Sequence, residues 1–87
     1  MEIKFHQKFK KNFKKRIQPQ HKLVEAFENR LSTFLQNQKH YLLRDHKLVG
    51  KFRDYRAFSI TGDIRLVYKI TDDTLFLYDI GTHNQVY

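Results

Sequence analysis

The spacing of hydrophobic residues changes along the chain, and each change predicts a new element. Residues 2–5 alternate polar and apolar side chains, which is typical of a short half-buried strand. Phe9, Phe13 and Ile17 recur every four residues and predict a helix with one apolar face. Pro19 ends this helix, because proline disfavours the α conformation in the residue before it and fits the first turn of a new helix. A second apolar stripe of about four turns follows, formed by Leu23, Val24, Phe27, Leu31, Phe34 and Leu35.

The second half of the chain has the pattern of strands. We expect strands over residues 55–61, 64–70 and 74–80, with turns at Gly62-Asp63 and at residues 71–73. These turns are short, so the strands should pair antiparallel. The polar, basic stretch 36–53 should be a loop ordered by apolar anchors, namely Tyr41, Leu42, Leu43, Leu48 and Phe52. The order β-α-α-β-β-β predicts an α+β fold, an antiparallel sheet with an N-terminal two-helix hairpin packed on one face and the other face open to a ligand.

Length and composition narrow the class of protein. A chain of 87 residues favours a single domain over residues 1–87. The absence of cysteine excludes a disulfide framework, a thiol nucleophile and Cys-ligated zinc. No apolar run is long enough to span a membrane, and the first residues lack the apolar stretch of a signal peptide, so we expect a cytoplasmic protein. No HxH, HExxH, P-loop or dinucleotide-binding pattern occurs, so we expect neither a metal nor a cofactor.

The charge of the chain is +8, and it is unevenly distributed. Residues 1–53 hold 14 basic and four acidic side chains, whereas residues 54–87 hold three basic and five acidic ones. Clustered Lys and Arg favour a nucleic acid or an acidic protein as partner over a merely solvated basic surface. The basic candidates for contact with such a partner are Lys8, Lys10, Lys11, Lys14, Lys15, Lys47, Lys51, Arg53 and Arg56.

Five residues near the strand ends could carry RNA cleavage: His46, Asp63, Arg65, His83 and Tyr87. That reaction needs a base for the 2′-hydroxyl proton, an acid for the leaving 5′-oxygen and a cation for the phosphorane charge. Histidine serves either proton role near neutral pH, and arginine grips phosphate oxygens. Taken singly, each residue also has an ordinary explanation, a cap for the histidines, a turn for Asp63 and a surface ion pair for Arg65.

Several motifs of the second half together resemble a known family. They are Asp45-His46-Lys47-Leu48-Val49-Gly50, Tyr55-Arg56, the run from Ile60 to Lys69 with its Gly-Asp turn and Arg65, and the run from Asp79 to Tyr87 with its Gly-Thr-His. The set resembles the YafQ branch of the RelE/ParE toxins, which belong to bacterial type II toxin–antitoxin pairs. The motifs cover residues 45–87, and the upstream order of one strand and two helices also fits.

The resemblance implies an endoribonuclease that enters the ribosomal A site and cuts mRNA. It implies a cognate antitoxin, acidic where it binds, and a toxin–antitoxin heterotetramer on operator DNA. Matched position by position, His83 corresponds to the general acid, His46 and Asp63 to candidate bases, and Arg65 to the transition-state arginine of RelE-like members. Tyr87 matches an aromatic position that orients or stacks on a base.

The chain departs from the YafQ pattern at two positions on the first strand of the sheet. Ala57 and Ser59 stand where YafQ has an acidic residue and a histidine, so one proton carrier is missing, and we expect Arg65 to supply electrostatic stabilisation instead. Two other hypotheses remain open. A ParE-like toxin would poison DNA gyrase but generally lacks the histidine and aspartate set, and a non-catalytic basic RNA-binding domain would leave that set without a role.

Overall fold

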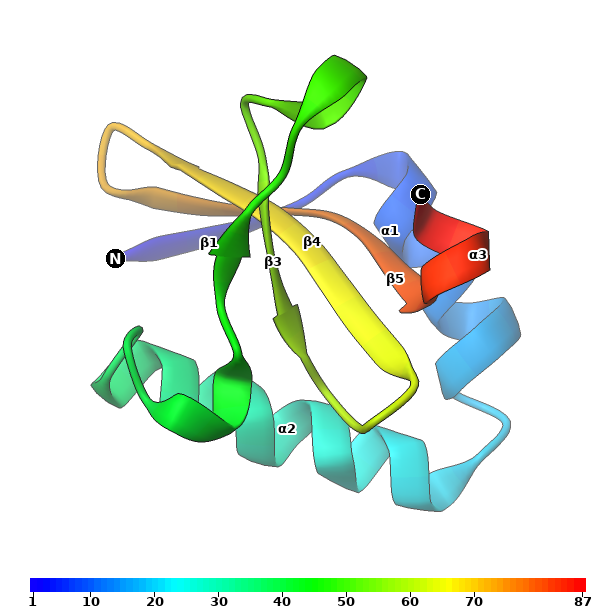
Figure 1. Cartoon of the computed structure of the whole chain (residues 1–87). Helices are drawn as coiled ribbons and strands as arrows, with labels where there is room; N and C mark the ends of the chain where they lie inside the picture. Colours follow the sequence, from blue (N-terminus) through cyan, green and yellow to red (C-terminus); the bar gives the residue numbers. More distant parts are fainter.

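The computed structural model describes residues 1–87 and builds them around a five-stranded sheet (Figure 1). The strands are β1 (Glu2–Phe5), β2 (His46–Lys47), β3 (Arg56–Ser59), β4 (Ile64–Thr71) and β5 (Thr74–Thr82). The helices are α1 (Gln7–Asn12), a π-helical continuation over Phe13–Ile17, α2 (His21–Gln36) and α3 (His83–Val86). Single 3₁₀ turns occupy Tyr41–Leu43 and Gly50–Phe52. No helix is both long and apolar enough to cross a membrane.

The sheet is mixed rather than purely antiparallel, which corrects one part of the prediction. Its strand order is β1-β5-β4-β3-β2, and β1 runs parallel to β5, whereas every other pair is antiparallel. The alternating pattern predicted β1 but not its partner. In the register Ile3 lies opposite Leu75 and Phe5 opposite Leu77, so β1 closes the free edge of β5.

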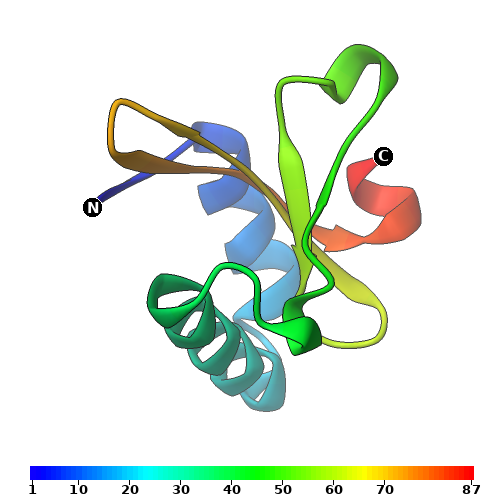
Figure 2. The same cartoon turned by 60° about the vertical axis from the view of Figure 1, so that its left-hand side comes forward.

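The expected helical pair covers one face of the sheet, and the other face is partly covered by elements that the sequence pattern did not predict. The main core joins α1, its π-helical continuation and α2 to the sheet through Phe9, Ile17 and Phe34 respectively, all of them buried. On the opposite face Val86 of α3 packs with Leu48 in a smaller cluster. Figure 2 shows α2 on one side of the strands and α3 on the other. The stretch 36–53, expected as a loop, contains two 3₁₀ turns and the edge strand β2.

A buried carboxylate fastens the first helical segment to β5. Asp79 is fully buried, and its Oδ1 accepts hydrogen bonds from Asn12 Nδ2 at 2.7 Å and from the backbone N–H of Ile80 at 2.8 Å. Arg16 Nη1 lies 3.5 Å from Oδ1, and Lys8 Nζ lies 3.7 Å from Oδ2. A buried charge is tolerated when it is paired and hydrogen-bonded in this way. Asp79 therefore sets the position of α1 relative to the end of β5, where His83 follows.

Replacing Asp79 with Asn should destabilise the fold. The new side chain has the same shape, but it is neutral and no longer attracts the positive charges of Lys8 and Arg16. We expect the free energy of unfolding to fall by about 1–3 kcal/mol. Urea denaturation measures the change. The matched control is Asp73→Asn, since the Asp73 carboxylate is exposed and lies 4.0 Å from the N-terminal amine. That control should change stability by less than about 0.5 kcal/mol, and an equal loss in the two variants would contradict a special role for Asp79.

Candidate active site

All five candidate catalytic residues line two cavities that share one side chain. The first cavity, about 320 Å³, is lined by residues that include His46, His83 and Tyr87. The second, about 300 Å³, is lined by residues that include Asp63, Arg65 and again His83. His83 thus stands between an imidazole and phenol on one side and a carboxylate and guanidinium on the other. The structure brings together residues from β2, the β3–β4 turn, β4 and α3.

His83 is the first residue of α3, and its position is fixed by the turn that precedes it. Thr82 Oγ1 accepts the N–H of Gln85 at 3.3 Å, and Gln85 Oε1 accepts the N–H of Thr82 at 2.8 Å, which is a reciprocal capping box. Gly81 comes just before it, with the ends of the Arg16 and Gln85 side chains packed against its backbone. A Cβ there would lie 2.7 Å from both Arg16 Nη1 and Gln85 Oε1. The Gly-Thr-His motif therefore holds an exposed imidazole on a rigid turn.

Arg65 and Asp63 are positioned by the turn between β3 and β4. Arg65 Nη1 donates to the carbonyls of Gly62 at 2.9 Å and Thr61 at 3.3 Å, so the guanidinium folds back over the turn. Thr61 Oγ1 accepts the N–H groups of Asp63 at 3.2 Å and Ile64 at 3.1 Å. The Asp63 side chain is exposed at the mouth of the cavity. This arrangement presents a preorganised cation beside a carboxylate, open to a phosphate.

Tyr87 lies four residues after His83, one helical turn further along the chain, and the two rings meet edge to face. Their centroids are 4.6 Å apart and the ring planes cross at 80°. The hydroxyl of Tyr87 is buried without a hydrogen-bond partner. Burial raises the pKa of this phenol above its ordinary value, and the positive charge of Arg65 partly opposes that rise. The phenol is therefore neutral near physiological pH, and its ring lines the cavity beside His83.

His46 lies on the edge strand β2, and its protonation pattern follows from its contacts. His46 Nδ1 lies 3.1 Å from the carbonyl oxygen of Arg44. A carbonyl only accepts, so a neutral His46 carries its proton on Nδ1 and leaves Nε2 with a free lone pair. An imidazole in this tautomer is ready to accept a proton.

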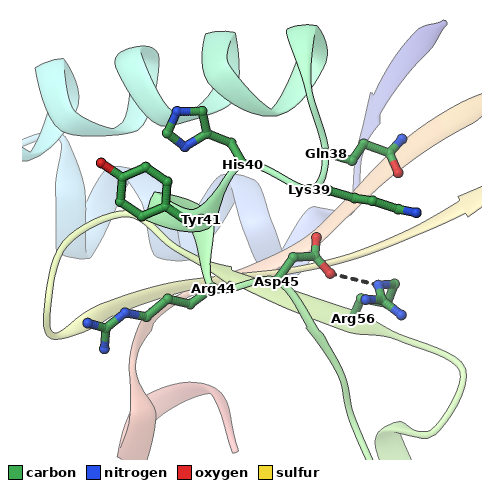
Figure 3. Close-up of a pocket in the computed structure, with 7 residues that line it drawn as sticks. All are labelled: Gln38, Lys39, His40, Tyr41, Arg44, Asp45 and Arg56. Carbon is green, nitrogen blue, oxygen red and sulfur yellow. Dashed lines mark hydrogen bonds and ion pairs between the residues drawn. The ribbon is translucent and has the colours of Figure 1, made fainter.

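The segment that carries His46 is clamped by its neighbour Asp45. Asp45 Oδ1 accepts from Arg56 Nε at 2.7 Å, and the Tyr68 hydroxyl donates to Oδ2 (Figure 3 shows the Arg56 pair). Burial and the bond to Asp45 both raise the pKa of the Tyr68 phenol, and the bond to Asp45 raises the pKa of Arg56. Asp45 thus fixes the edge strand on which His46 lies. The sequence predicts a site role for His46 but none for Asp45, its neighbour in the same motif.

Asp45→Asn should loosen the β2 edge, because an amide cannot accept from both partners as the carboxylate does. We expect a loss of about 1–2 kcal/mol in the free energy of unfolding. If the chain cleaves RNA as proposed below, the rate should fall as well. Asp54→Asn, an exposed acid of the same region, is the matched control for both measurements. A variant of Asp45 with unchanged stability would contradict the clamp.

The basic candidates are placed in different ways. Lys10, Lys11, Lys14 and Lys15 are exposed along the first helical segment, and Lys47, Lys51 and Arg53 are exposed near β2. Two of the expected RNA contacts are already engaged within the protein. Lys8 pairs with Asp79 and lies over the Tyr78 ring, 5.0 Å from its centroid, and Arg56 pairs with Asp45.

Two residues that differ from the YafQ pattern lie directly beside the site. Ala57 is opposite His46 and Ser59 is opposite Arg65 in the strand register, and both are buried. Neither supplies a proton carrier. No group of three or more His, Cys, Asp or Glu side chains is arranged to hold a metal ion.

The mixed five-stranded sheet with its covering helices is the fold of YafQ and RelE-like toxins. The chain belongs to the family described as "Bacterial toxin of type II toxin-antitoxin system, YafQ", whose pattern matches residues 1–87. The protein is therefore the toxin of a type II toxin–antitoxin system, as the motifs of residues 45–87 predicted.

Solved structures agree with this assignment. YafQ from E. coli strain BL21(DE3) is 25% identical, with a TM-score of 0.85 over 99% of this chain and 97% of that one. YafQ in the E. coli DinJ–YafQ complex is 29% identical, with a TM-score of 0.80 over 99% and 97% of the two chains. A YoeB/ParE toxin from Agrobacterium tumefaciens shares the fold at 16% identity, with a TM-score of 0.81 over 95% and 99%. No curated protein matches the chain in sequence.

Proposed function

We propose that this toxin is an endoribonuclease that cuts mRNA in the ribosomal A site and so inhibits translation. The observation that supports it is the shared position of His83, which lines one cavity with His46 and Tyr87 and the adjoining cavity with Asp63 and Arg65. A scissile phosphate beside His83 would have a proton acceptor, a proton donor and a cation around it. These are the three groups that the reaction needs.

In the proposed reaction His46 Nε2 takes the proton of the 2′-hydroxyl, and the 2′-oxygen attacks the adjacent phosphorus. The bond from phosphorus to the 5′-oxygen breaks as His83 gives that oxygen a proton. The products are a 2′,3′-cyclic phosphate and a 5′-hydroxyl. His46 is the better candidate for the base than Asp63, because the contact of its Nδ1 with the Arg44 carbonyl leaves Nε2 with a free lone pair.

Arg65 would stabilise the charge that develops on the phosphorane oxygens, since its guanidinium is held before substrate arrives. Tyr87 would orient the nucleotide by stacking its ring, which lines the cavity, on a base. Both roles use groups that need little rearrangement on binding.

The partners follow from the family and from charge. The E. coli DinJ–YafQ complex supports a cognate antitoxin as a partner of this toxin. The charge of the chain and the family resemblance lead us to expect an acidic binding segment in that antitoxin, and a toxin–antitoxin heterotetramer on operator DNA. The exposed lysines of the first helical segment would contact ribosomal RNA phosphates, which makes binding dependent on salt. The reaction would take place in the cytoplasm, where ribosomes translate, and the residues call for no metal or cofactor.

Two experiments test the proposal. In the first, the toxin is expressed in cells and new mRNA 5′ ends are mapped. In the second, the purified toxin is incubated with purified message, with and without ribosomes. We expect ends that keep a fixed phase to the codon and that appear only with ribosomes. Cleavage of free RNA in the absence of ribosomes would contradict a ribosome-dependent reaction. Gyrase-dependent DNA breaks without mRNA cleavage would instead indicate a ParE-like activity.

A further inference from the structure

A cavity larger than either of the two at the candidate active site lies outside that site, beside the segment between α2 and β2. It measures about 560 Å³ and is lined by Gln38, Lys39, His40, Tyr41, Arg44, Asp45 and Arg56 (Figure 3). Three of these side chains are cationic. The sole acid, Asp45, is already bonded to Arg56 and Tyr68. The cavity is therefore suited to an anion, and its size is that of sites that hold small ligands.

Two stacked aromatic rings, a half-buried His40 and an exposed Tyr41, form one wall of this cavity. The rings of His40 and Tyr41 stack with centroids 4.9 Å apart and planes 19° from parallel. His40 is held in place, because its Nδ1 accepts the N–H of Leu42 at 3.2 Å. Tyr41 is 80% exposed, an unusual position for a large ring that does not pack in the core. The ring offers a flat surface to another planar group.

A row of cavities connects this wall to the active site. Tyr41 and Arg44 also line a neighbouring cavity that contains Arg30 and Gly62. Gly62 in turn lines the cavity of Asp63, Arg65 and His83. An extended polymer, such as a single strand of RNA, that left the active site over the Gly62 turn would pass Arg30 and Arg44 before it reached the stacked rings of His40 and Tyr41.

We propose that this cavity binds a nucleotide of single-stranded RNA, with its base stacked on Tyr41 and its phosphates held by Arg44 and Lys39. The inference rests on the proposed ribonuclease function, because it gives the same substrate class a second contact. The stacked wall favours a base, since bases stack on aromatic rings regardless of sequence. The cations favour a polyanion, and the connection to the active site favours RNA over an acidic peptide of the antitoxin. The RNA is either the message or a single-stranded part of ribosomal RNA.

Equilibrium binding to two probes tests this site and identifies the source of the RNA. One probe is a short fluorescein-labelled single-stranded 2′-O-methyl RNA, which lacks the 2′-hydroxyl nucleophile and so measures binding without cleavage. The other is ribosomes without message. Tyr41→Ala and Arg44→Gln should each weaken binding about tenfold. The controls Tyr41→Phe, which keeps the ring, and Lys22→Gln, which removes an equal charge on α2, should bind like the wild type.

Weakened binding to the RNA oligonucleotide assigns the site to the message, and weakened binding to ribosomes alone assigns it to ribosomal RNA. Wild-type affinity of both variants for both probes would overturn the inference. So would variants that bind RNA normally but lose affinity for the cognate antitoxin. If the wild type binds RNA through Tyr41 yet cuts no message, the inference stands and the proposed nuclease function fails.

Discussion

His83→Ala should reduce the rate of mRNA cleavage by about 10²–10⁴-fold, because the leaving 5′-oxygen then departs without a proton donor. His83 is exposed at the start of α3 and contributes nothing to the buried core, so the fold should be unchanged. The measurement is single-turnover cleavage on programmed ribosomes, with circular dichroism to verify folding. Growth arrest on induction gives the same comparison in cells.

Asn84→Ala provides the matched control, since Asn84 is the next exposed residue of α3 and lines the same cavity as Arg65. It should retain most of the rate. A folded His83→Ala variant with full cleavage would exclude His83 as the general acid.

Arg65→Ala should lower the cleavage rate by about 10²–10³-fold, because a preorganised donor to the developing phosphorane charge is lost. Arg65→Lys should recover only part of the rate. A lysine offers one compact charge instead of a planar fork, and it cannot both bond the turn carbonyls of Thr61 and Gly62 and face the phosphate.

The loss should be in the maximal rate more than in the affinity for ribosomes, since the transition state carries more charge than the bound message. Saturating the variant with ribosomes separates the two effects. A rate fully restored at saturation would show that Arg65 only binds.

The sequence predicted the elements of the sheet and the helices better than it predicted how they pair. Alternation revealed β1, but the pattern of residues 2–5 carries no information about the direction of a partner seventy residues away, so the parallel pairing with β5 was missed. The helix α3 was also missed, although Thr82 and Gln85 have the spacing of a capping box. This spacing predicts a helix start at Thr82, but α3 is a single turn and therefore shows no repeating apolar pattern.

The same contrast holds for the site. The strand-end residues His46, Arg65 and His83 could be named from sequence, and the structure groups them around adjoining cavities. The supporting carboxylates could not, because Asp45 meets Tyr68 and Asp79 meets Asn12 across many residues of chain. Local pattern reports on neighbours in sequence, whereas these contacts exist only after the sheet has formed. The pairing of Lys8 with Asp79 was missed for the same reason, since the two residues are distant in sequence.

We propose that His46 and His83 take opposite proton roles at one phosphate, and a leaving-group substitution in the message separates these two roles. A message whose scissile 5′-oxygen is replaced by sulfur has a leaving group that needs no general acid. We predict that His83→Ala cuts this message nearly as fast as the wild type does, while His46→Ala stays slow. Equal defects in the two variants on the sulfur-substituted message would contradict the account.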